Sequence, residues 1–310
     1  MKRINHTLFG ESISRLNDVK RFNLISQRII KKLFATVMLS TLFLISGCEY
    51  VYNGPGFPII EENPNAEPWF NIYRPADMVA AIEETENLLP VIVWANGGCF
   101  RSDFPWQPLF KRWAAEGYVV LALSETPNGG ALASTNVAHH GALIDWILNE
   151  ASYTDLIDSD RVIAAGNSCG GVTGLGLTAI DSRVAGVFVL SGSSAIGSTS
   201  KRIMEAIDVP VGYVIGDGTD VAGGPARSDY EAMLEGVPAM VVSRAKGGHI
   251  TVSTTTSILE EVADISFHWM DLVLYGNADS YDELMSDDVC SDCTPDIWTL
   301  ESKNLETLLD

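Results

Sequence analysis

The chain has 310 residues, of which 40 are Asp or Glu and 20 are Lys or Arg, so its formal net charge is −20 at pH 7. Such an acidic surface repels the phosphates of nucleic acids and anionic lipids, which argues against a protein that binds either of them. The hydrophobic content of 46% is sufficient for a globular domain with a large core.

The first 47 residues are predicted to be a secretory signal that is removed and takes no part in the fold. Residues 28–32 are rich in basic side chains, and residues 33–45 form an apolar stretch that is too short to span a bilayer permanently. The stretch ends in Ile45-Ser-Gly-Cys48, which is similar to a bacterial lipobox, where the Cys is lipidated and becomes the new N-terminus. The alternative is an ordinary signal peptide in which Cys48 is present by chance.

Lipidation of Cys48 predicts an exported protein that is anchored to a bacterial membrane through its N-terminal lipid and lies on the periplasmic or extracellular face. Glu49, and not Asp, follows Cys48, which favours export of the lipoprotein to the outer membrane if the source is Gram-negative. Residues 1–47 hold eight Lys or Arg and two Asp or Glu, which leaves 12 basic and 38 acidic residues and a net charge of −26. We interpret this charge as a solvated acidic shell, and we expect a monomer.

Residues 48–68 are rich in Gly, Pro, Asn and Glu, a composition typical of a flexible tether. From residue 69 to residue 310, short apolar runs alternate with helical patterns, which predicts one α/β domain with a mostly parallel, twisted sheet and flanking helices. The expected strands are residues 89–94, 117–123, 162–165, 184–190, 209–215 and 237–242. The expected helices are residues 106–116, 137–150, 172–180 and 254–274. The short gap from 190 to 209 leaves little room for a separate lid domain.

The most informative segment is Gly166-Asn-Ser-Cys-Gly170, a G-x-S-x-G pentapeptide. The expected strand 162–165 precedes it, and the expected helix 172–180 follows it. Strand, sharp turn and helix form the context of a nucleophile elbow, in which the turn pushes the serine Oγ out above the sheet. Glycines suit the two flanking positions because side chains there would collide with the neighbouring strand and helix. Ser168 is therefore the predicted nucleophile, and the alternative is a structural turn in a chain with 27 glycines.

A serine hydroxyl needs a base to take its proton, and that base needs an acid to orient it. In this kind of fold the order along the chain is Ser, then Asp or Glu, then His. Asp220 follows the expected strand 209–215, and His249 follows the expected strand 237–242, both in Gly-rich loops at carboxyl ends of strands, where sites form in open sheets. Asp217 is the rival acid because it is closer to the strand end, but Asp220 leaves enough loop to reach back to the imidazole.

The remaining histidines fit the role of base less well. His139, His140 and His268 fall in segments with a helical pattern, away from any strand end, where a histidine is more often a partly buried or surface residue. His6 belongs to the predicted signal. We therefore predict His249 as the base.

An oxyanion hole needs two backbone N–H groups that point at one position. One is expected from Cys169, which directly follows the nucleophile at the start of a helix. The other is expected from the turn Asn96-Gly-Gly-Cys99 after the first core strand, with Gly98 as the first choice and Cys99 as the second. Taken alone, this Gly-Gly sequence fits a plain turn equally well.

Several aromatic residues near these loops are candidates for the substrate pocket. The aromatic candidates are Trp94, Phe100, Phe104 and Trp106. Cys99, Phe100 and Trp106 are selected as the predicted lining. Packing in the core against the first helix is the alternative for each aromatic residue. No metal ion and no organic cofactor is required by chemistry of this kind.

Four cysteines besides Cys48 would lie in an oxidising compartment. Cys290-x-x-Cys293 predicts a structural disulfide, since no second CxxC and no nearby His supports a zinc site. Cys99 and Cys169 are far apart in the sequence but both fall beside the expected oxyanion hole. A disulfide between them is a hypothesis, with two free thiols as the alternative.

Together these motifs resemble those of the α/β-hydrolase superfamily, specifically the secreted dienelactone-hydrolase, cutinase and polyester-hydrolase-like esterases. The resemblance covers roughly residues 70–303. It implies an α/β-hydrolase fold and a carboxylic ester hydrolase with Ser168 as nucleophile, His249 as base and Asp220 as acid. The matching segments are residues 89–99, 117–120, 158–171, 209–211, 216–222 and 248–249, with a similar C-terminal tail at residues 269–276, 290–293 and 298.

Two other functions stay open at this point. A serine peptidase on the same fold would share every motif, although such enzymes usually add a cap or propeller domain, for which this chain has little room. A non-catalytic surface lipoprotein that binds ligands or polymers would have no use for an activated serine. The acyl group, the alcohol and the choice between a polymer and a small ester are not encoded in any motif of the chain.

Overall fold

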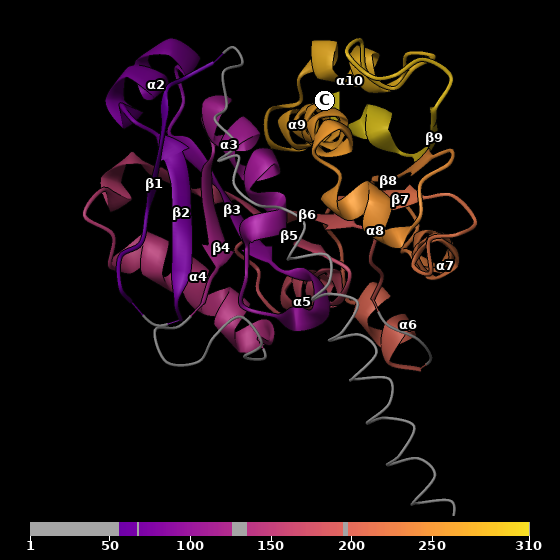
Figure 1. Cartoon of the computed structure of the whole chain (residues 1–310), viewed down its shortest axis with the longest axis horizontal. Coiled ribbons are helices and arrows are strands. Elements are labelled where there is room, and N and C mark those ends of the chain that lie inside the picture. Colours follow the sequence, from indigo (N-terminus) through magenta and orange to yellow (C-terminus); the bar gives the residue numbers. More distant parts are fainter. Residues whose placement is uncertain (1–55, 67, 126–134, 195–197, 310) are drawn as a thin grey trace, which may run out of the picture. The chain divides into compact units, whose positions relative to one another are not determined.

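In the part of the chain that the computed structural model describes, which is residues 56–66, 68–125, 135–194 and 198–309, nine strands form one sheet. They are β1 (Ile59–Glu62), β2 (Phe70–Pro75), β3 (Leu89–Ala95), β4 (Val119–Leu123), β5 (Ile157–Asn167), β6 (Val184–Leu190), β7 (Val211–Gly216), β8 (Ala239–Arg244) and β9 (Trp298–Lys303). The order across the sheet is β1-β2-β4-β3-β5-β6-β7-β8-β9 (Figure 1). All these residues belong to one compact unit, Tyr52–Asp310.

The centre of the sheet is parallel and its margins are antiparallel. Neighbouring strands from β4 through β3 to β8 run parallel, whereas β1 pairs antiparallel with β2, β2 with β4, and β9 with β8. Strands β3, β4 and β6 are almost continuously apolar, β5 is so from Val162 to Ala165, and every residue of β3 and of β4 is buried. This is the pattern of a sheet with both faces covered. The predicted α/β class and the mostly parallel sheet are confirmed.

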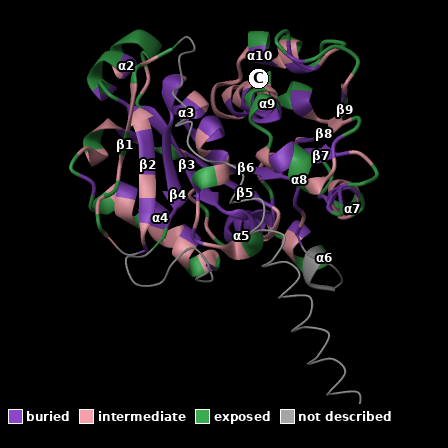
Figure 2. Ribbon diagram, viewed as in Figure 1, coloured by how far each residue is buried: buried purple, intermediate pink, exposed green. Residues whose placement is uncertain are grey.

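Helices pack on the two faces of the sheet. They are α2 (Met78–Thr85), α3 (Gln107–Ala115), α4 (Val137–Asn149), α5 (Cys169–Thr178), α6 (Ser198–Met204), α7 (Gly223–Ala232), α8 (His249–Thr254), α9 (Thr256–Tyr275) and α10 (Ala278–Leu284). One core contains side chains of α3, α8, α9 and α10, and the other contains side chains of α2, α4, α5, α6 and α7. Figure 2 shows the buried residues concentrated in the strands between them.

Alternate residues of β3 show how the sheet separates these two cores. Ile92 and Trp94 contribute to the core under α3 and α9, whereas Val91 and Val93 contribute to the core under α4 and α5. Successive side chains of a strand point to opposite faces, so a continuous apolar run serves both cores. The strand is thereby fixed along its length, and the turn that follows it starts from a rigid position.

The expected tether of residues 48–68 is wrong in its second half. Ile59–Glu62 is strand β1, with Ile59 paired to Pro75 and Glu62 paired to Ile72. Phe57 donates its N–H to the Ala115 carbonyl at 2.8 Å. The Gly and Pro content of this segment predicted a loop, but its two isoleucines supply an edge strand that pairs with β2. The folded unit therefore begins before residue 69.

The predicted helix 254–274 corresponds to α9, which starts at Thr256 and ends at Tyr275. Thr255, in an extended conformation, separates it from the short helix α8, which the sequence did not predict. Thr and Ser side chains compete with the helix ladder and favour helix ends, which explains the break in this Thr-rich segment. His249, which the sequence placed in a Gly-rich loop, is the first residue of α8.

The predicted signal, the lipidation at Cys48 and the first part of the tether lie outside the described residues. Within those residues, no helix is both long enough and apolar enough to cross a membrane. The same residues contain no cluster of three or more His, Cys, Asp or Glu side chains that could hold a metal ion.

Candidate active site

Ser168 lies at the turn between β5 and α5. Its backbone has φ 52° and ψ −115°, which an L-residue adopts rarely. A Cβ on Gly170 would lie 1.8 Å from the Ala95 carbonyl oxygen, and a Cβ on Gly166 would lie 2.4 Å from the Gly170 oxygen. Only glycine lets the backbones approach so closely. The strand, turn and helix that the G-x-S-x-G pattern requires are therefore all present.

Three side chains from separate segments meet beyond the carboxyl ends of the parallel strands. The imidazole Nε2 of His249 is 3.0 Å from the Oγ of Ser168, and its Nδ1 is 2.8 Å from the Oδ1 of Asp220. The Asp220 side chain is fully buried, whereas that of His249 is 21% exposed. With Nδ1–H donating to the carboxylate, Nε2 is free to accept the serine proton, which is the geometry that a general base requires.

The carboxylate of Asp220 is held in place by two backbone groups. The N–H of Gly216 donates to Oδ2 at 2.9 Å, and the N–H of Ala222 donates to Oδ1 at 2.9 Å. Burial alone raises the pKa of Asp220, but the hydrogen bonds from His249, Gly216 and Ala222 outweigh it and hold the pKa below its usual value. The group therefore stays ionised and is aimed at the imidazole. Sequence reasoning missed both N–H donors.

Asp217, the rival acid, has different partners. Its carboxylate accepts hydrogen bonds from the N–H and the hydroxyl of Thr219 at 3.1 and 2.9 Å, and from the N–H of Lys246 at 3.0 Å. Its own N–H donates to the Gly247 carbonyl at 2.8 Å. Asp217 thus ties the segment before His249 to the end of β7, and Asp220 is the acid that the structure places against the imidazole.

The rival histidines lie elsewhere. His140 is buried with Nε2 2.7 Å from the Val93 carbonyl oxygen, and burial lowers its pKa to about 4. His268 has Nδ1 3.3 Å from the Ser280 hydroxyl, and burial lowers its pKa as well. His139 is in the first turn of α4. The described hydrogen bonds connect none of the three to Ser168.

Two backbone N–H groups beside Ser168 are candidates for an oxyanion hole. The N–H of Cys99, the second choice, donates to the Asn96 carbonyl at 3.2 Å and is therefore occupied. Within the described residues, the N–H groups of Gly98 and Cys169 have no hydrogen-bond acceptor. Unused donors at the start of a helix and in a turn beside it are suited to stabilise a developing negative charge.

Buried asparagines fix the ends of β3 and β5. The Asn96 amide donates to the carbonyls of Leu123 and Phe100, and the Asn167 amide donates to the Leu190 carbonyl at 2.8 Å. Both side chains satisfy carbonyl groups where the strands stop pairing. Their positions directly before Gly97 and Ser168 were the available sequence signal for this role.

The structure contains both disulfides that the sequence suggested. Cys99 and Cys169 are joined across 70 residues with a Cα–Cα distance of 5.2 Å, and Cys290 is joined to Cys293. The hypothesis of a Cys99–Cys169 bridge is thus confirmed, and the alternative of two free thiols is wrong. Cys99 is therefore part of a covalent link between the two candidate oxyanion segments.

The aromatic candidates divide between core and surface. Trp106 is 5% exposed and packs on Trp94, with ring centroids 5.8 Å apart, so core packing describes both residues. Phe100 is half-buried with its ring against Gly98, and Phe104 is 51% exposed. Of the two predicted aromatic lining residues, Phe100 lies beside Gly98, whereas the buried Trp106 ring packs against Gly97 of the same turn.

Asp103 is a buried carboxyl group in the same loop. The Tyr73 hydroxyl and the Asn71 amide both donate to its Oδ2, at 2.8 and 2.9 Å. Burial raises the pKa of Asp103 to about 6 in spite of these hydrogen bonds. Because the native pKa is above the unfolded value, the native state binds the proton more tightly, and the resulting stability is present below pH ~4 and lost as the pH rises through about 6.

We expect the variant Asp103→Asn to lack this pH dependence, since a neutral amide oxygen can still accept from Tyr73 and Asn71. The free energy of unfolding of the wild type, relative to the variant, should fall by about 2 kcal/mol between pH 4 and pH 7. Denaturant unfolding at several pH values measures the difference, with Asp160→Asn on the exposed surface as the control. Parallel curves for the wild type and Asp103→Asn would contradict the expectation.

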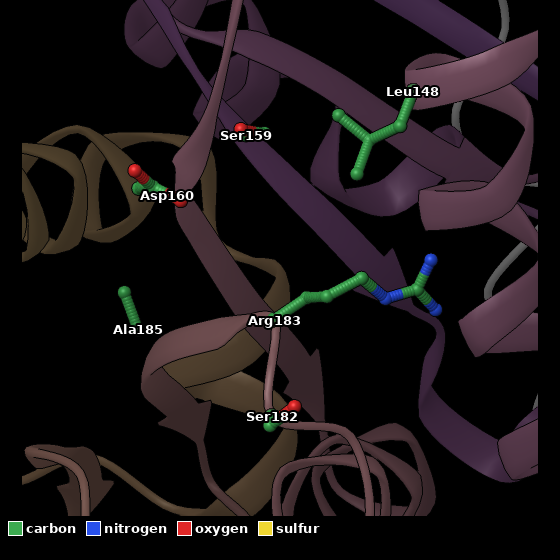
Figure 3. Close-up of a pocket in the computed structure, with 6 residues that line it drawn as sticks. All are labelled: Leu148, Ser159, Asp160, Ser182, Arg183 and Ala185. Carbon is green, nitrogen blue, oxygen red and sulfur yellow. The ribbon is translucent and has the colours of Figure 1, made fainter.

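One open pocket of about 310 Å³ lies away from these groups. Its lining residues come from α4, from the first half of β5 and from the segment around the start of β6, whereas Ser168 follows the carboxyl end of β5. Figure 3 shows these residues. The Arg183 guanidinium there is already paired with Asp181 and Asp145. The lining residues are Leu148, Ser159, Asp160, Ser182, Arg183 and Ala185. None of these described residues is hydrogen-bonded to Ser168, His249 or Asp220, so we do not assign a catalytic role to this pocket.

No protein-family model matches the chain, and no curated protein is similar enough to count as a relative.

Proposed function

We propose that this protein is a serine hydrolase of the α/β-hydrolase superfamily that cleaves carboxylic esters. The observation that carries the proposal is the hydrogen-bonded chain from Ser168 Oγ through the His249 imidazole to Asp220, with distances of 3.0 and 2.8 Å. A half-buried serine in a rare backbone conformation, an oriented imidazole and a buried carboxylate seldom coincide without a catalytic role. The resemblance to secreted esterases favours an ester over an amide as the substrate.

The mechanism is acyl transfer to water. Ser168 Oγ attacks the ester carbonyl carbon while His249 Nε2 accepts the hydroxyl proton, and Asp220 stabilises the imidazolium that forms. The N–H groups of Gly98 and Cys169 donate to the oxyanion of the tetrahedral intermediate. His249 then protonates the leaving alcohol. Water, deprotonated by the same imidazole, attacks the acyl-enzyme, and the carboxylic acid is released with Ser168 restored.

This reaction needs neither a metal ion nor an organic cofactor, because all its proton transfers are made by side chains of the chain itself. The proposed location is the periplasmic or extracellular face of a bacterial membrane, with an N-terminal lipid at Cys48 as the anchor. Two disulfides are consistent with an oxidising compartment.

A substrate panel tests the proposal. Purified protein should hydrolyse p-nitrophenyl esters, and the acyl length that gives the highest kcat/KM, from acetyl to decanoyl, would define the acyl preference. Matched p-nitroanilides should react far more slowly. Equal rates on anilides and esters would indicate a peptidase, and a lack of turnover on every ester would indicate a non-catalytic binding protein.

A further inference from the structure

The Cys99–Cys169 disulfide joins the two segments that carry the candidate oxyanion donors. Cys169 is itself one of these donors, and Cys99 directly follows the other donor, Gly98. The bridge therefore spans from the turn after β3 to the first residue of α5. Of the three proposed catalytic residues, Ser168 is next to a bridged cysteine in the sequence, and Asp220 and His249 are not.

The backbone on both sides of the bridge is in a conformation that needs external support. Gly98 has φ 67°, Cys99 has φ 52° and Ser168 has φ 52°. The two residues that are not glycine adopt the left-handed region rarely, and such geometry persists only where the surroundings hold it. A covalent link that ends at Cys99 on one side and beside Ser168 on the other is a direct constraint on all three.

Two other contacts lie near these segments, but neither joins the Gly98 N–H to the Cys169 N–H. The Cys99 carbonyl accepts hydrogen bonds from the N–H and the hydroxyl of Thr135 at 2.9 and 3.1 Å. At the base of the two turns, the absence of a side chain at Gly170 lets the start of α5 pass against the Ala95 carbonyl. The Cys99–Cys169 disulfide is the covalent connection between the two segments that carry the donors.

We propose that the Cys99–Cys169 disulfide sets the separation of the Gly98 and Cys169 N–H groups, so that Cys99 and Cys169 are positioning residues for the oxyanion hole. This inference rests on the proposed function. An oxyanion hole depends on donors that are placed before the charge develops, and removing one donor typically lowers kcat by about 10²–10³-fold. Loosening both donors without removing either is expected to cost less than that.

The test compares two double variants. Cys99→Ala/Cys169→Ala removes the bridge at the donors, and Cys290→Ala/Cys293→Ala removes the other disulfide, which lies between α10 and β9. At a temperature well below both unfolding midpoints, we expect the first variant to lose on the order of 10–100-fold in kcat with little change in KM. The second variant should keep the wild-type kcat.

An inhibitor separates positioning from general stability. An alkyl boronic acid forms a tetrahedral adduct on the serine with an oxygen where the oxyanion develops. Its Ki should rise in Cys99→Ala/Cys169→Ala by the same factor by which kcat/KM falls, while the affinity for the product alcohol and the pH profile of kcat stay unchanged. An unchanged kcat and Ki, with only a lower unfolding midpoint, would overturn the proposal and leave the bridge a purely structural one.

A second arm avoids dependence on the folding of the first variant. Folded Cys290→Ala/Cys293→Ala protein keeps the Cys99–Cys169 bridge, which a dithiol reductant cleaves to two thiols with transfer of two electrons and two protons, itself becoming a cyclic disulfide. The kcat should fall by the same 10–100-fold and return on reoxidation. Reduction without any loss of kcat would also overturn the proposal. A wild type that hydrolyses no ester would instead refute the proposed function.

Discussion

Replacement of Ser168 by alanine is expected to lower kcat on short p-nitrophenyl esters by on the order of 10⁶-fold. In the proposed mechanism the Ser168 oxygen forms the acyl-enzyme, and without the hydroxyl the imidazole 3.0 Å away has no proton to accept. The fold should persist, because alanine faces the same backbone constraint at φ 52° as serine does. Steady-state kinetics of wild type and variant at equal concentration measure the effect, and far-UV circular dichroism checks the fold.

The matched control for Ser168→Ala is Ser182→Ala. Ser182 is an exposed serine just before β6 and has no role in the proposed mechanism. The kcat and the free energy of unfolding of Ser182→Ala should therefore match those of the wild type. Retention of wild-type kcat in Ser168→Ala, or an equal loss in the control, would show that the hydrolysis has another origin.

Replacement of Asp220 by asparagine is expected to lower kcat by about 10⁴-fold. The amide keeps the shape of the carboxylate, but it does not stabilise an imidazolium and it lets the His249 ring adopt the wrong tautomer. The variant should also be less stable by about 1–3 kcal/mol, because the amide nitrogen must face one of the N–H groups that now donate to the carboxylate. Kinetics and denaturant unfolding measure the two effects separately.

Asp217→Asn is the matched control for Asp220→Asn, because it alters a carboxylate in the same loop that also accepts two backbone N–H bonds. Its partners are Thr219 and Lys246, so its kcat should stay within about tenfold of the wild type. If Asp217→Asn lost as much kcat as Asp220→Asn, the assignment of the acid would have to be exchanged between the two residues.

The centre of the fold could be predicted from the sequence because parallel strands buried on both faces are continuous apolar runs. Residues 89–94 and 184–190 are strands β3 and β6 almost to the residue. The margins could not be predicted in the same way. Strands β2 and β9 carry charged and polar residues among apolar ones, and β1 lies in a segment whose Gly and Pro suggested a tether. Their pairing depends on a sheet edge that only the folded chain provides.

The candidate site could be predicted from the sequence because each of its side chains follows a predicted strand. Carboxyl ends of parallel strands meet at one edge of the sheet, so Ser168, Asp220 and His249 converge there. Which of Asp217 and Asp220 contacts the imidazole depends on the loop conformation, in which the N–H groups of Gly216 and Ala222 donate to the Asp220 carboxylate. Backbone donors of this kind carry no side-chain signature, and the sequence did not indicate them.

Reaction with a fluorophosphonate probe, followed by mass spectrometry of the digested protein, tests the central claim most directly. Such a probe phosphonylates a serine only when a neighbouring base activates it. A single adduct on Ser168 in the wild type, absent from both Ser168→Ala and His249→Ala, is the result that the proposed mechanism predicts. Folded wild-type protein that acquires no adduct, or that acquires it on a different residue, would contradict the mechanism.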